Sequence, residues 1–566
     1  MKRKIIYIVM PVLVFFAACK KQLDINTDPN NAVTASVSKL LPEVQKNLGY
    51  SLTTGSGLSQ FLAVYTHQLS TRESPDQYGV TGNDFNIQEA WTTMYSSVLN
   101  NAEVIITQGT EDGNLQYVGI AKVIKAYAYS QFVDVFGDVP FSEAGQLKAG
   151  ILNPKFDKGA DIYPALMVIL DEAIADLNNA AAANILKPGN DDIIYKGNIA
   201  RWTKAANTIK LKLLLQQRLL RNVSAEVNAL IAANNLIGAT ADSFLLPYGP
   251  NGATDDRNPG FGDYYASQRG QYVSPWFYEI LKGYNAKIYP GIEDPRIPYY
   301  FFNQLTPTQA TESSTATEYR DGGFVSLYFG SQGQDKARTQ QNNSTMVGIY
   351  PVGGRYDDGK GKNGAAAGSK ITAADATGAG PYRFITYADR LFMEAELMKT
   401  NVITGDAKAK LQAAIQESFK QIDYVITTYV KPNQTVPAIA TTAATTAYIS
   451  SVMQQYDALP AQQLESIITQ KWIASFGSAV DQYTDYRRTG FPVLFNPKNA
   501  AMAPGGFVQP PINGNPALPG AQKRVPVELN RNFPLTLPWY STELSSNSSA
   551  PAQKTDLSTF KPFWLP

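Results

Sequence analysis

The sequence predicts a mainly α-helical protein in which a scaffold of paired helices, of the tetratricopeptide-repeat kind, carries an irregular, loop-rich lobe. Two observations support this fold class. Apolar residues recur at steps of three and four through several long segments, which is the period of one face of an α-helix. Between these segments lie long stretches crowded with Gly, Asn, Asp, Pro and Tyr, and loops of such length usually carry function.

The first residues have the build of a secretory signal. A basic head, residues 1–4, precedes an apolar run of 14 residues that closes on two alanines just before Cys19. The run contains Pro11 and is shorter than the roughly 20 residues that a membrane-spanning helix needs. We therefore expect export and removal of residues 1–18 as a signal peptide.

Cys19 is the only cysteine of the chain, and the stretch FAAC resembles the bacterial lipobox, in which this cysteine is lipidated and becomes the first residue. Several acyl chains on one residue anchor a protein stably, whereas a single chain is marginal. We expect Cys19 to be a lipid anchor, residues 19–31 to be a flexible tether, and residues 32–566 to form the folded domain. A free, reactive thiol is the alternative.

Six segments carry the helical pattern. The first two, 91–106 and 115–136, are joined by a short polar linker and should form a helical hairpin. Gly137, Asp138 and Pro140 should form the turn that ends the second helix. The other four segments are 162–177, 200–220, 387–398 and 464–476. The spacing is too irregular for a clean repeat of roughly 34 residues, so we expect degenerate repeats over about 85–222 and 385–480.

The helical stripes also account for three tryptophans, Trp91, Trp202 and Trp472, which we expect in the core. The loop-rich lobe should cover about residues 240–380. The final segment, 496–566, has many prolines and short apolar pieces, and we expect it to lie across the surface.

Composition argues against several classes of protein. A net charge of +1 without a basic block argues against nucleic-acid binding. With Cys19 used as an anchor, thiolate metal sites and cysteine nucleophiles are excluded. The single histidine, His67, stands without a G-x-S-x-G nucleophile motif, and we expect it to be a partly exposed helical residue. No cofactor is predicted. TDPNN and ATDDRN offer oxygen ligands to a structural calcium ion, but neither matches a full calcium loop.

Two groups of charged residues should be structural. Arg487 and Arg488 lie close in sequence to Asp481 and Asp485, so we expect a structural ion-pair cluster rather than a clamp for an acidic ligand. The motif Asp294–Arg296 should form polar contacts within a turn.

Six sequence blocks, in a fixed order, point to a known family. They are VDVFGDVPFSEA (133–144), WTKAANTIKLKLLL (202–215), IEDPRIPYYF (292–301), ITYADRLFMEAELM (385–398), ITQKWIASFGSAVDQYTDYRRTGFP (468–492) and KRVPVELNRN (523–532). With these blocks the chain resembles the SusD/RagB-like family of nutrient-binding outer-membrane lipoproteins. The resemblance is closest to the subgroup whose C-terminal block ends in RRTGFP.

The resemblance implies a helical scaffold that docks on a SusC-like TonB-dependent outer-membrane transporter, with loops that hold an oligosaccharide or peptide above the barrel. It implies binding without catalysis, and a lipid-anchored position on the outer membrane that faces the outside. Lys20 and Lys21 precede Asp24, the reverse of the charge order in family members displayed on the surface. The alternatives are a scaffold protein without a ligand and a glycan-degrading enzyme. The enzyme would need a pair of catalytic carboxylates, and no local sequence motif identifies such a pair.

Aromatic residues in the aperiodic parts of the chain are the candidates for contact with a ligand. The stretch DYYASQRGQYVSPWFYEI has the highest density of rings, together with side chains able to bond hydroxyls or carbonyls. The predicted ligand-binding residues are Tyr78, Tyr264, Tyr265, Gln268, Arg269, Tyr272 and Trp276. The alternative is that these rings only pack the loops against one another.

Overall fold

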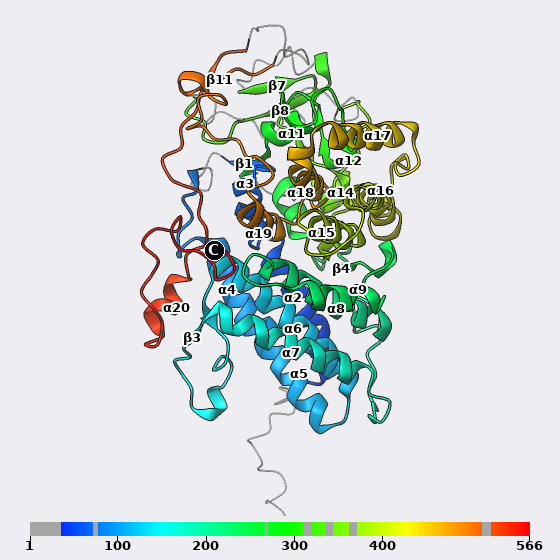
Figure 1. The fold of residues 1–566 in the computed structure, drawn as a ribbon, viewed down its shortest axis with the longest axis vertical. Helices are drawn as coiled ribbons and strands as arrows, with labels where there is room; N and C mark the ends of the chain where they lie inside the picture. The colour runs from blue at the N-terminus through cyan, green and yellow to red at the C-terminus, as the bar shows by residue number, and fades with distance from the viewer. Residues whose placement is uncertain are drawn as a thin grey trace, which may run out of the picture.

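The computed structural model describes residues 35–71, 77–266, 270–308, 318–333, 343–361, 371–511 and 522–566. The expected signal, anchor and tether, with Cys19, lie outside these residues. The described chain forms two groups of helices and a loop-rich lobe (Figure 1), and most of its buried apolar residues belong to one continuous core. None of the helices within the described segments is long and apolar enough to cross a bilayer.

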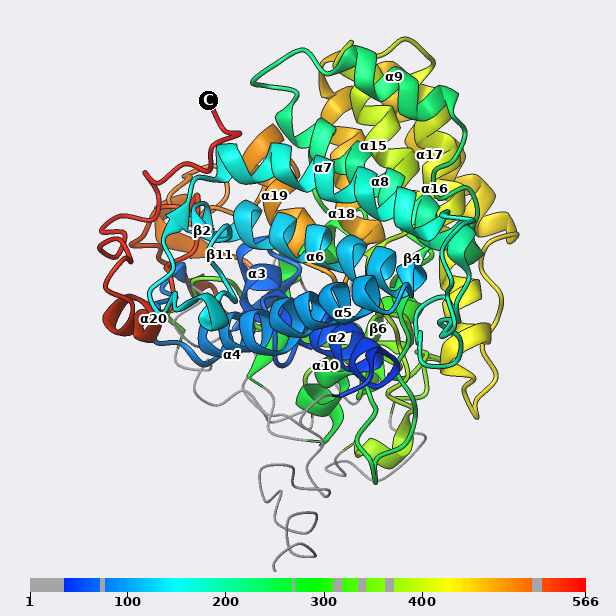
Figure 2. The same ribbon diagram turned by 90° about the horizontal axis from the view of Figure 1, so that it is seen from below.

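Most of the first group of helices forms the lower part of Figure 1. Its helices are α2 (Val37–Leu52), α3 (Ser59–Tyr65), α4 (Phe85–Thr93), α5 (Asn100–Glu111), α6 (Leu115–Phe136), α7 (Gly159–Leu177), α8 (Ile199–Gln217) and α9 (Ser224–Ala232). Helices α5, α6, α7 and α8 lie side by side in chain order (Figure 2). A Cβ atom at Gly119 would lie 2.8 Å from the carbonyl oxygen of Ala173, so glycine allows α6 and α7 to approach this closely.

The second group packs on the first and contains the later helices. These are α15 (Tyr387–Lys399), α16 (Ala407–Val425), α17 (Ala443–Ala458), α18 (Gln463–Ala474) and α19 (Val480–Thr489). Helix α15 contacts both α16 and α18. It begins with a capping box, in which the Thr386 hydroxyl accepts a bond from the Asp389 amide (3.1 Å) and the Asp389 carboxylate accepts one from the Thr386 amide (2.8 Å).

The predicted helices are confirmed in all six segments. The hairpin 91–106 and 115–136 is present, with a π-helical turn, η3 (Met94–Leu99), that joins α4 to α5. Trp91, Trp202 and Trp472 are buried as expected. Helices α16 and α17 lie within the predicted repeat range 385–480 but were not predicted as separate segments, and α2, α9 and α19 lie outside the predicted helical ranges. The mainly helical fold class is confirmed, whereas the tetratricopeptide character of the helix pairs stays a prediction.

The loop-rich lobe contains short elements only. Its strands pair two by two, all antiparallel: β1 (Leu69–Thr71) with β5 (Gln271–Val273), β4 (Phe244–Leu246) with β10 (Tyr382–Ile385), β6 (Phe301–Phe302) with β9 (Met346–Val347), and β7 (Tyr319–Asp321) with β8 (Phe324–Ser326). Its short helices are α10 (Pro259–Phe261), α11 (Pro275–Leu281), α12 (Ile297–Tyr300) and α14 (Ile349–Val352). Buried aromatic rings hold these loops together, for example Tyr278 stacked on Phe324 with 3.8 Å between ring centroids.

The described chain after α19, residues 490–511 and 522–566, forms a tail that runs along one side of the molecule (Figure 1, orange to red). The tail contains β11 (Phe507–Val508), paired with β12 (Val525–Pro526), and α20 (Ser541–Ser546). A further pair, β2 (Val139–Pro140) with β3 (Phe156–Asp157), follows α6. Near the end of the tail, the Lys554 ammonium donates to the carbonyl oxygen of Phe136 (2.6 Å), and the Trp564 indole donates to Asp134 (3.0 Å). The tail therefore lies across the surface, as its composition indicates.

A buried ion network joins the two helical groups. Both Arg218, just after α8, and Arg488 of α19 contact the buried Glu396 of α15, at 2.8 and 2.7 Å. Arg488 also contacts Asp485 (2.7 Å), which contacts Lys471 of α18 (2.7 Å). Burial by itself raises the pKa of Glu396, but Arg488 and Arg218 outweigh this effect and hold the pKa at about 2.

The predicted ion-pair cluster is confirmed for Arg488 and Asp485. It is wrong for Arg487 and Asp481. Arg487 instead lies over the ring of Tyr483, with 3.8 Å between its guanidinium carbon and the ring centroid, and Asp481 pairs with Lys212 (2.9 Å). Arg487 and Arg488 are adjacent on a helix and therefore point to different neighbours. The Asp294–Arg296 motif forms a fully buried ion pair at 2.6 Å.

We predict that Glu396→Gln lowers the free energy of unfolding by about 3 kcal/mol at pH 7, because it leaves buried arginines without their anion. The folded-state pKa of Glu396 lies below its unfolded value, so its contribution is present above about pH 4.5 and is lost as the pH falls toward about 2. Urea unfolding at pH 7 and at pH 3 should show the difference between variant and wild type shrinking at the lower pH.

The matched control is Glu226→Gln, which breaks the exposed pair of Glu226 with Arg221 (2.7 Å). An exposed pair contributes at most about 1 kcal/mol. Equal losses in the two variants would contradict the role given to Glu396.

Candidate functional site

Three neighbouring hollows lie along the line where the tail meets the rest of the molecule. The Trp276 hollow (about 210 Å³) is lined by Trp276, Glu279, Tyr328, Phe495, Met502, Pro504, Phe507, Val508, Gln509 and Arg524. The Lys498 hollow (about 300 Å³) is lined by Tyr78, Tyr486, Gly490, Val493, Leu494, Phe495, Asn496, Lys498, Asn499, Met502, Leu529, Arg531, Asn532 and Phe533. The Asp556 hollow (about 320 Å³) is lined by Tyr78, Gly79, Val80, Thr81, Arg531, Asn532, Pro534, Thr555, Asp556, Leu557 and Ser558.

The three hollows share walls. Phe495 and Met502 line both the Trp276 hollow and the Lys498 hollow, and Tyr78, Arg531 and Asn532 line both the Lys498 hollow and the Asp556 hollow. Together they form one elongated depression, here called the tail groove. Two of the residues predicted to contact a ligand, Trp276 and Tyr78, are brought together in it.

Trp276 is the first of these residues. Helix α11 begins at Pro275, which suits the first position of a helix, and places Trp276 in the next position. The ring is half-buried, its Nε1 donates to the carbonyl oxygen of Val493 (3.0 Å), and its centroid lies 5.9 Å from that of Phe495. The tail thus fixes the orientation of the ring in the wall of the groove.

Tyr78 is held by an aromatic cluster beneath the groove. Its ring lies 5.1 to 5.3 Å, between centroids, from the rings of Tyr65, Phe329 and Phe533. Its hydroxyl lies 3.1 Å from Nε2 of His67. The backbone of Tyr78 has a φ of +55°, a region that non-glycine residues rarely adopt, so the surrounding contacts hold it in place.

The expected partial exposure of His67 is wrong. His67 is fully buried between α3 and β1, with its ring centroid 4.2 Å from that of Phe329. Burial lowers the pKa of the imidazole to about 3, so it is neutral at physiological pH. The expected helical position is wrong as well, because α3 ends at Tyr65 and His67 lies in the turn that follows, with a φ of +59°. His67 supports Tyr78 from below.

The other predicted residues are placed differently. Tyr264, Tyr265 and Tyr272 are each 1% exposed and lie in the core of the loop-rich lobe rather than in the groove. The Tyr265 hydroxyl donates to the carbonyl oxygen of Val347 and accepts from the amide of Arg355, and Tyr272 belongs to β5. For these three rings the structure shows loop packing, because so irregular a lobe needs buried rings of its own. Gln268 and Arg269 lie outside the described residues.

The polar lining of the Lys498 hollow was not predicted from the sequence. It consists of the exposed side chains Asn496, Lys498, Asn499, Arg531 and Asn532. All of them come from the tail, where the sequence has no periodic pattern that would show which side chains share a face. The blocks NPKN and NRN, rich in amides and cations, were the available signal.

The Trp276 hollow contains a carboxyl group with an unusual pKa. Burial, and to a lesser degree the charge of Asp321, raises the pKa of Glu279 to about 7, while the Tyr319 hydroxyl opposes the shift. Glu279 is therefore partly protonated near neutral pH and can both donate and accept hydrogen bonds. Arg524 also lines this hollow and lies over the ring of Phe507, 4.7 Å from its centroid.

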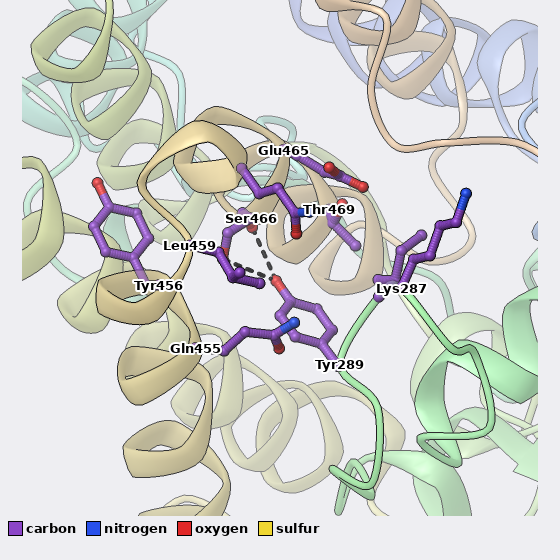
Figure 3. Close-up of a pocket in the computed structure, with 10 residues that line it drawn as sticks. Lys287, Tyr289, Gln455, Tyr456, Leu459, Glu465, Ser466 and Thr469 are labelled. Carbon is purple, nitrogen blue, oxygen red and sulfur yellow. Dashed lines mark hydrogen bonds between the residues drawn. The ribbon is translucent and has the colours of Figure 1, made fainter.

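Two further hollows lie outside the groove. The one in Figure 3, between α17, α18 and the loop at Tyr289, has a volume of about 20 Å³, enough for a single water, and the Tyr289 hydroxyl is already bonded to Ser466 (3.1 Å). The other, of about 710 Å³, lies among α7, α8 and α9, but its ionic side chains are paired with each other, as Lys210 is with Asp171 (2.5 Å).

The proposed calcium motifs gain no support from the described residues. In ATDDRN, Asp255 pairs with Arg257 (3.0 Å) and Asp256 accepts from the amide of Asn251 (2.7 Å). TDPNN lies outside the described segments. Where the structure is described, no group of three or more His, Cys, Asp or Glu side chains is arranged to hold a metal ion.

Comparison with known proteins defines the class. Residues 29–509 match the family model SusD-like_2, described as starch-binding and associating with the outer membrane. The match spans most of the chain, so the chain belongs to the SusD-like family. In the sense of that family it is an outer-membrane-associated binding protein. The RRTGFP subgroup stays a prediction.

Solved structures share the fold. A chitin-binding protein is 19% identical, with 90% of this chain and 94% of that one covered and a TM-score of 0.64. A SusD homolog from Bacteroides fragilis is 21% identical (90% and 94% covered, TM-score 0.61), and a SusD/RagB family protein from Bacteroides thetaiotaomicron is 20% identical (91% and 95% covered, TM-score 0.63). Among curated protein sequences there is no match.

We predict that Glu279→Gln stabilises the protein at pH 8.5 and changes little at pH 4. The folded-state pKa of Glu279, about 7, lies above the unfolded value of 4.5, so the charged form destabilises the fold increasingly as the pH rises from 4.5 through 7. The gain at pH 8.5 should be on the order of 1 to 3 kcal/mol, after allowance for partial exposure.

Urea unfolding at the two pH values measures this effect. The control is Glu111→Gln at the exposed end of α5, which should change stability at neither pH. A gain for Glu279→Gln that is the same at both pH values would show that the carboxyl is not the cause.

Proposed function

We propose that this protein binds an oligosaccharide or peptide nutrient in the tail groove and delivers it to a SusC-like TonB-dependent transporter of the outer membrane. The observation that carries the proposal is the groove itself. Trp276, Tyr328 and Phe495 line its first hollow, and amide and cationic side chains line the next. Rings with a few oriented polar groups are the usual lining of a site for a small organic ligand.

Binding without catalysis fits the described residues of the groove. Glu279 and Asp556 are its lining carboxyl residues within the described chain, and they lie in different, non-adjacent hollows. A glycosidase needs two carboxyl groups on either side of one bond, about 5 to 10 Å apart. The single buried histidine, His67, supports Tyr78 and has no nucleophile motif beside it.

Family membership also supports the proposed location. We propose that Cys19 is lipidated, that the protein is anchored to the outer membrane, and that it faces the outside of the cell. The helical scaffold is then the part available to the transporter, because the walls of the tail groove come mostly from the tail and the loop-rich lobe.

We predict that Trp276→Ala weakens ligand binding by about 1 to 3 kcal/mol, the usual cost of removing a ring that stacks on a ligand. The measurement is calorimetric titration, with a panel of oligosaccharides and peptides, of a protein that lacks residues 1–19. Saturable binding without product formation is the expected behaviour of the wild type.

The control is Phe85→Ala, which removes a ring that is 62% exposed on α4, outside the groove. It should bind as the wild type does. Thermal melts of both variants separate loss of binding from loss of folding. A correctly folded Trp276→Ala protein with unchanged affinity would remove this residue from the site, and product formation would indicate an enzyme.

We further predict that Cys19→Ser moves the protein from the membrane fraction to the soluble fraction, because the acyl chains are its membrane anchor. The melting temperature should not change, since Cys19 precedes the folded domain. When the tagged wild type is purified from the same membranes in mild detergent, a TonB-dependent outer-membrane transporter should co-purify with it. Membrane retention of the variant without any acyl chain detectable by mass spectrometry would disprove lipidation.

A further inference from the structure

The Lys498 hollow offers hydrogen-bond donors and cations but few free acceptors. Asn496 and Asn499 accept, through their side-chain oxygens, from the backbone amides of Lys498 and Ala501 (2.9 Å each). The side-chain oxygen of Asn532 accepts from the ammonium of Lys498 (3.2 Å). Each amide oxygen thus already accepts one hydrogen bond, whereas the three NH₂ groups donate none to the described residues and are available as donors to a ligand.

Two positive charges add to these donors. Arg531 is exposed, and within the described residues its guanidinium forms no hydrogen bond or ion pair. The ammonium of Lys498 contacts only neutral oxygens, those of Asn532 and of the Arg531 carbonyl (3.4 Å). No described residue that lines this hollow is an Asp or Glu. No carboxyl group in the described walls of the Lys498 hollow therefore neutralises its two positive charges.

The neighbouring hollows differ in this respect. Each has a carboxyl group beside its cation: the Trp276 hollow has Glu279 and Arg524 in its wall, and the Asp556 hollow has Asp556 and the shared Arg531. A negatively charged ligand group would be repelled in part by the carboxylate of either neighbour, and would be attracted most strongly to the middle of the groove, where two cations share a described wall without a carboxyl group. Charge therefore distinguishes one position along the groove from the others.

We propose that the tail groove binds an anionic glycan, and that a carboxylate or sulfate group of one sugar unit lies in the Lys498 hollow, against Lys498, Arg531 and the three asparagine NH₂ groups. This inference rests on the proposed function and adds the class of ligand. Donors and cations around one site match an anion with several acceptor oxygens. The rings of Tyr78, Tyr486 and Phe533 in the same wall suit the C–H faces of a sugar ring.

The test uses an oligogalacturonide and the same oligosaccharide with its carboxylates methyl-esterified, which removes the charge and keeps the chain. A sulfated glycosaminoglycan fragment with its desulfated form is the second arm, and a glutamate-rich peptide with its glutamine counterpart is the third. We expect at least one charged glycan to bind about tenfold or more tightly than its neutral form at low salt, and the preference to fall as salt is added.

The variant Lys498→Gln/Arg531→Gln should bind the charged and neutral forms alike. The control, Lys46→Gln/Lys187→Gln, removes two exposed positive charges outside the groove and should keep the preference. All four side chains are exposed, so both double variants should melt as the wild type does.

The outcomes distinguish a failure of the anionic ligand class from a failure of the proposed function. If neutral glycans bind as tightly as charged ones, and Trp276→Ala still weakens binding, the anionic class is wrong and the proposed function stands. If no glycan and no peptide binds, the proposed function itself fails. A preference confined to the acidic peptide, or one that the Lys498→Gln/Arg531→Gln variant retains, would also overturn the inference.

Discussion

The ion network centred on Glu396 is the interaction on which the rest of the structure depends. One buried carboxylate receives guanidinium groups from the end of α8 and from α19, so a single charge holds together helices that are distant in the sequence. A buried charge is tolerated only where it is fully paired, so the network requires one relative placement of these helices. Helix α19 leads directly into the tail, and its position therefore sets where the tail begins to form the groove.

The tail groove depends on the relative placement of these helices and also on contacts between its own walls. Its walls come from the tail on one side and from α11 and the loop at Tyr78 on the other. The hydrogen bond from Trp276 to Val493 joins these walls across 217 residues of sequence. Below them, the neutral imidazole of His67 and a set of aromatic rings give Tyr78 a rigid support. The groove walls are therefore held in place by contacts within the protein, which would lower the entropic cost of binding the proposed ligand.

Much of the helical part of the fold could be predicted from the sequence. The apolar residues of a long amphipathic helix recur with the helical period whatever the helix packs against. Helix α17 was not predicted as a separate segment, because its exposed side is rich in Thr and Ser, which are poor helix formers. Its inner face nevertheless carries apolar residues at helical spacing, which were a signal for this helix: Tyr448, Ile449, Val452, Met453 and Tyr456. Of the residues predicted to contact a ligand, Trp276 and Tyr78 line the groove, whereas Tyr264, Tyr265 and Tyr272, predicted with equal weight, are buried in the loop-rich lobe. The abundance of rings is visible in a sequence, whereas their burial is decided by contacts between distant loops. For the same reason the cations and amides of the tail were not predicted.

The docking of Trp564 on Asp134 has a consequence for how the molecule is made. This hydrogen bond connects residues 430 positions apart, so it is among the last contacts that a growing chain can form. Helices α5 to α8 consist of local contacts and can assemble early during synthesis. The groove walls contributed by residues 493–509 and 524–533, and the closing contact of Trp564, must wait until the final residues have been translated. Assembly of the scaffold and assembly of the tail groove are thereby separated in time, and a chain still in synthesis has the first without the second.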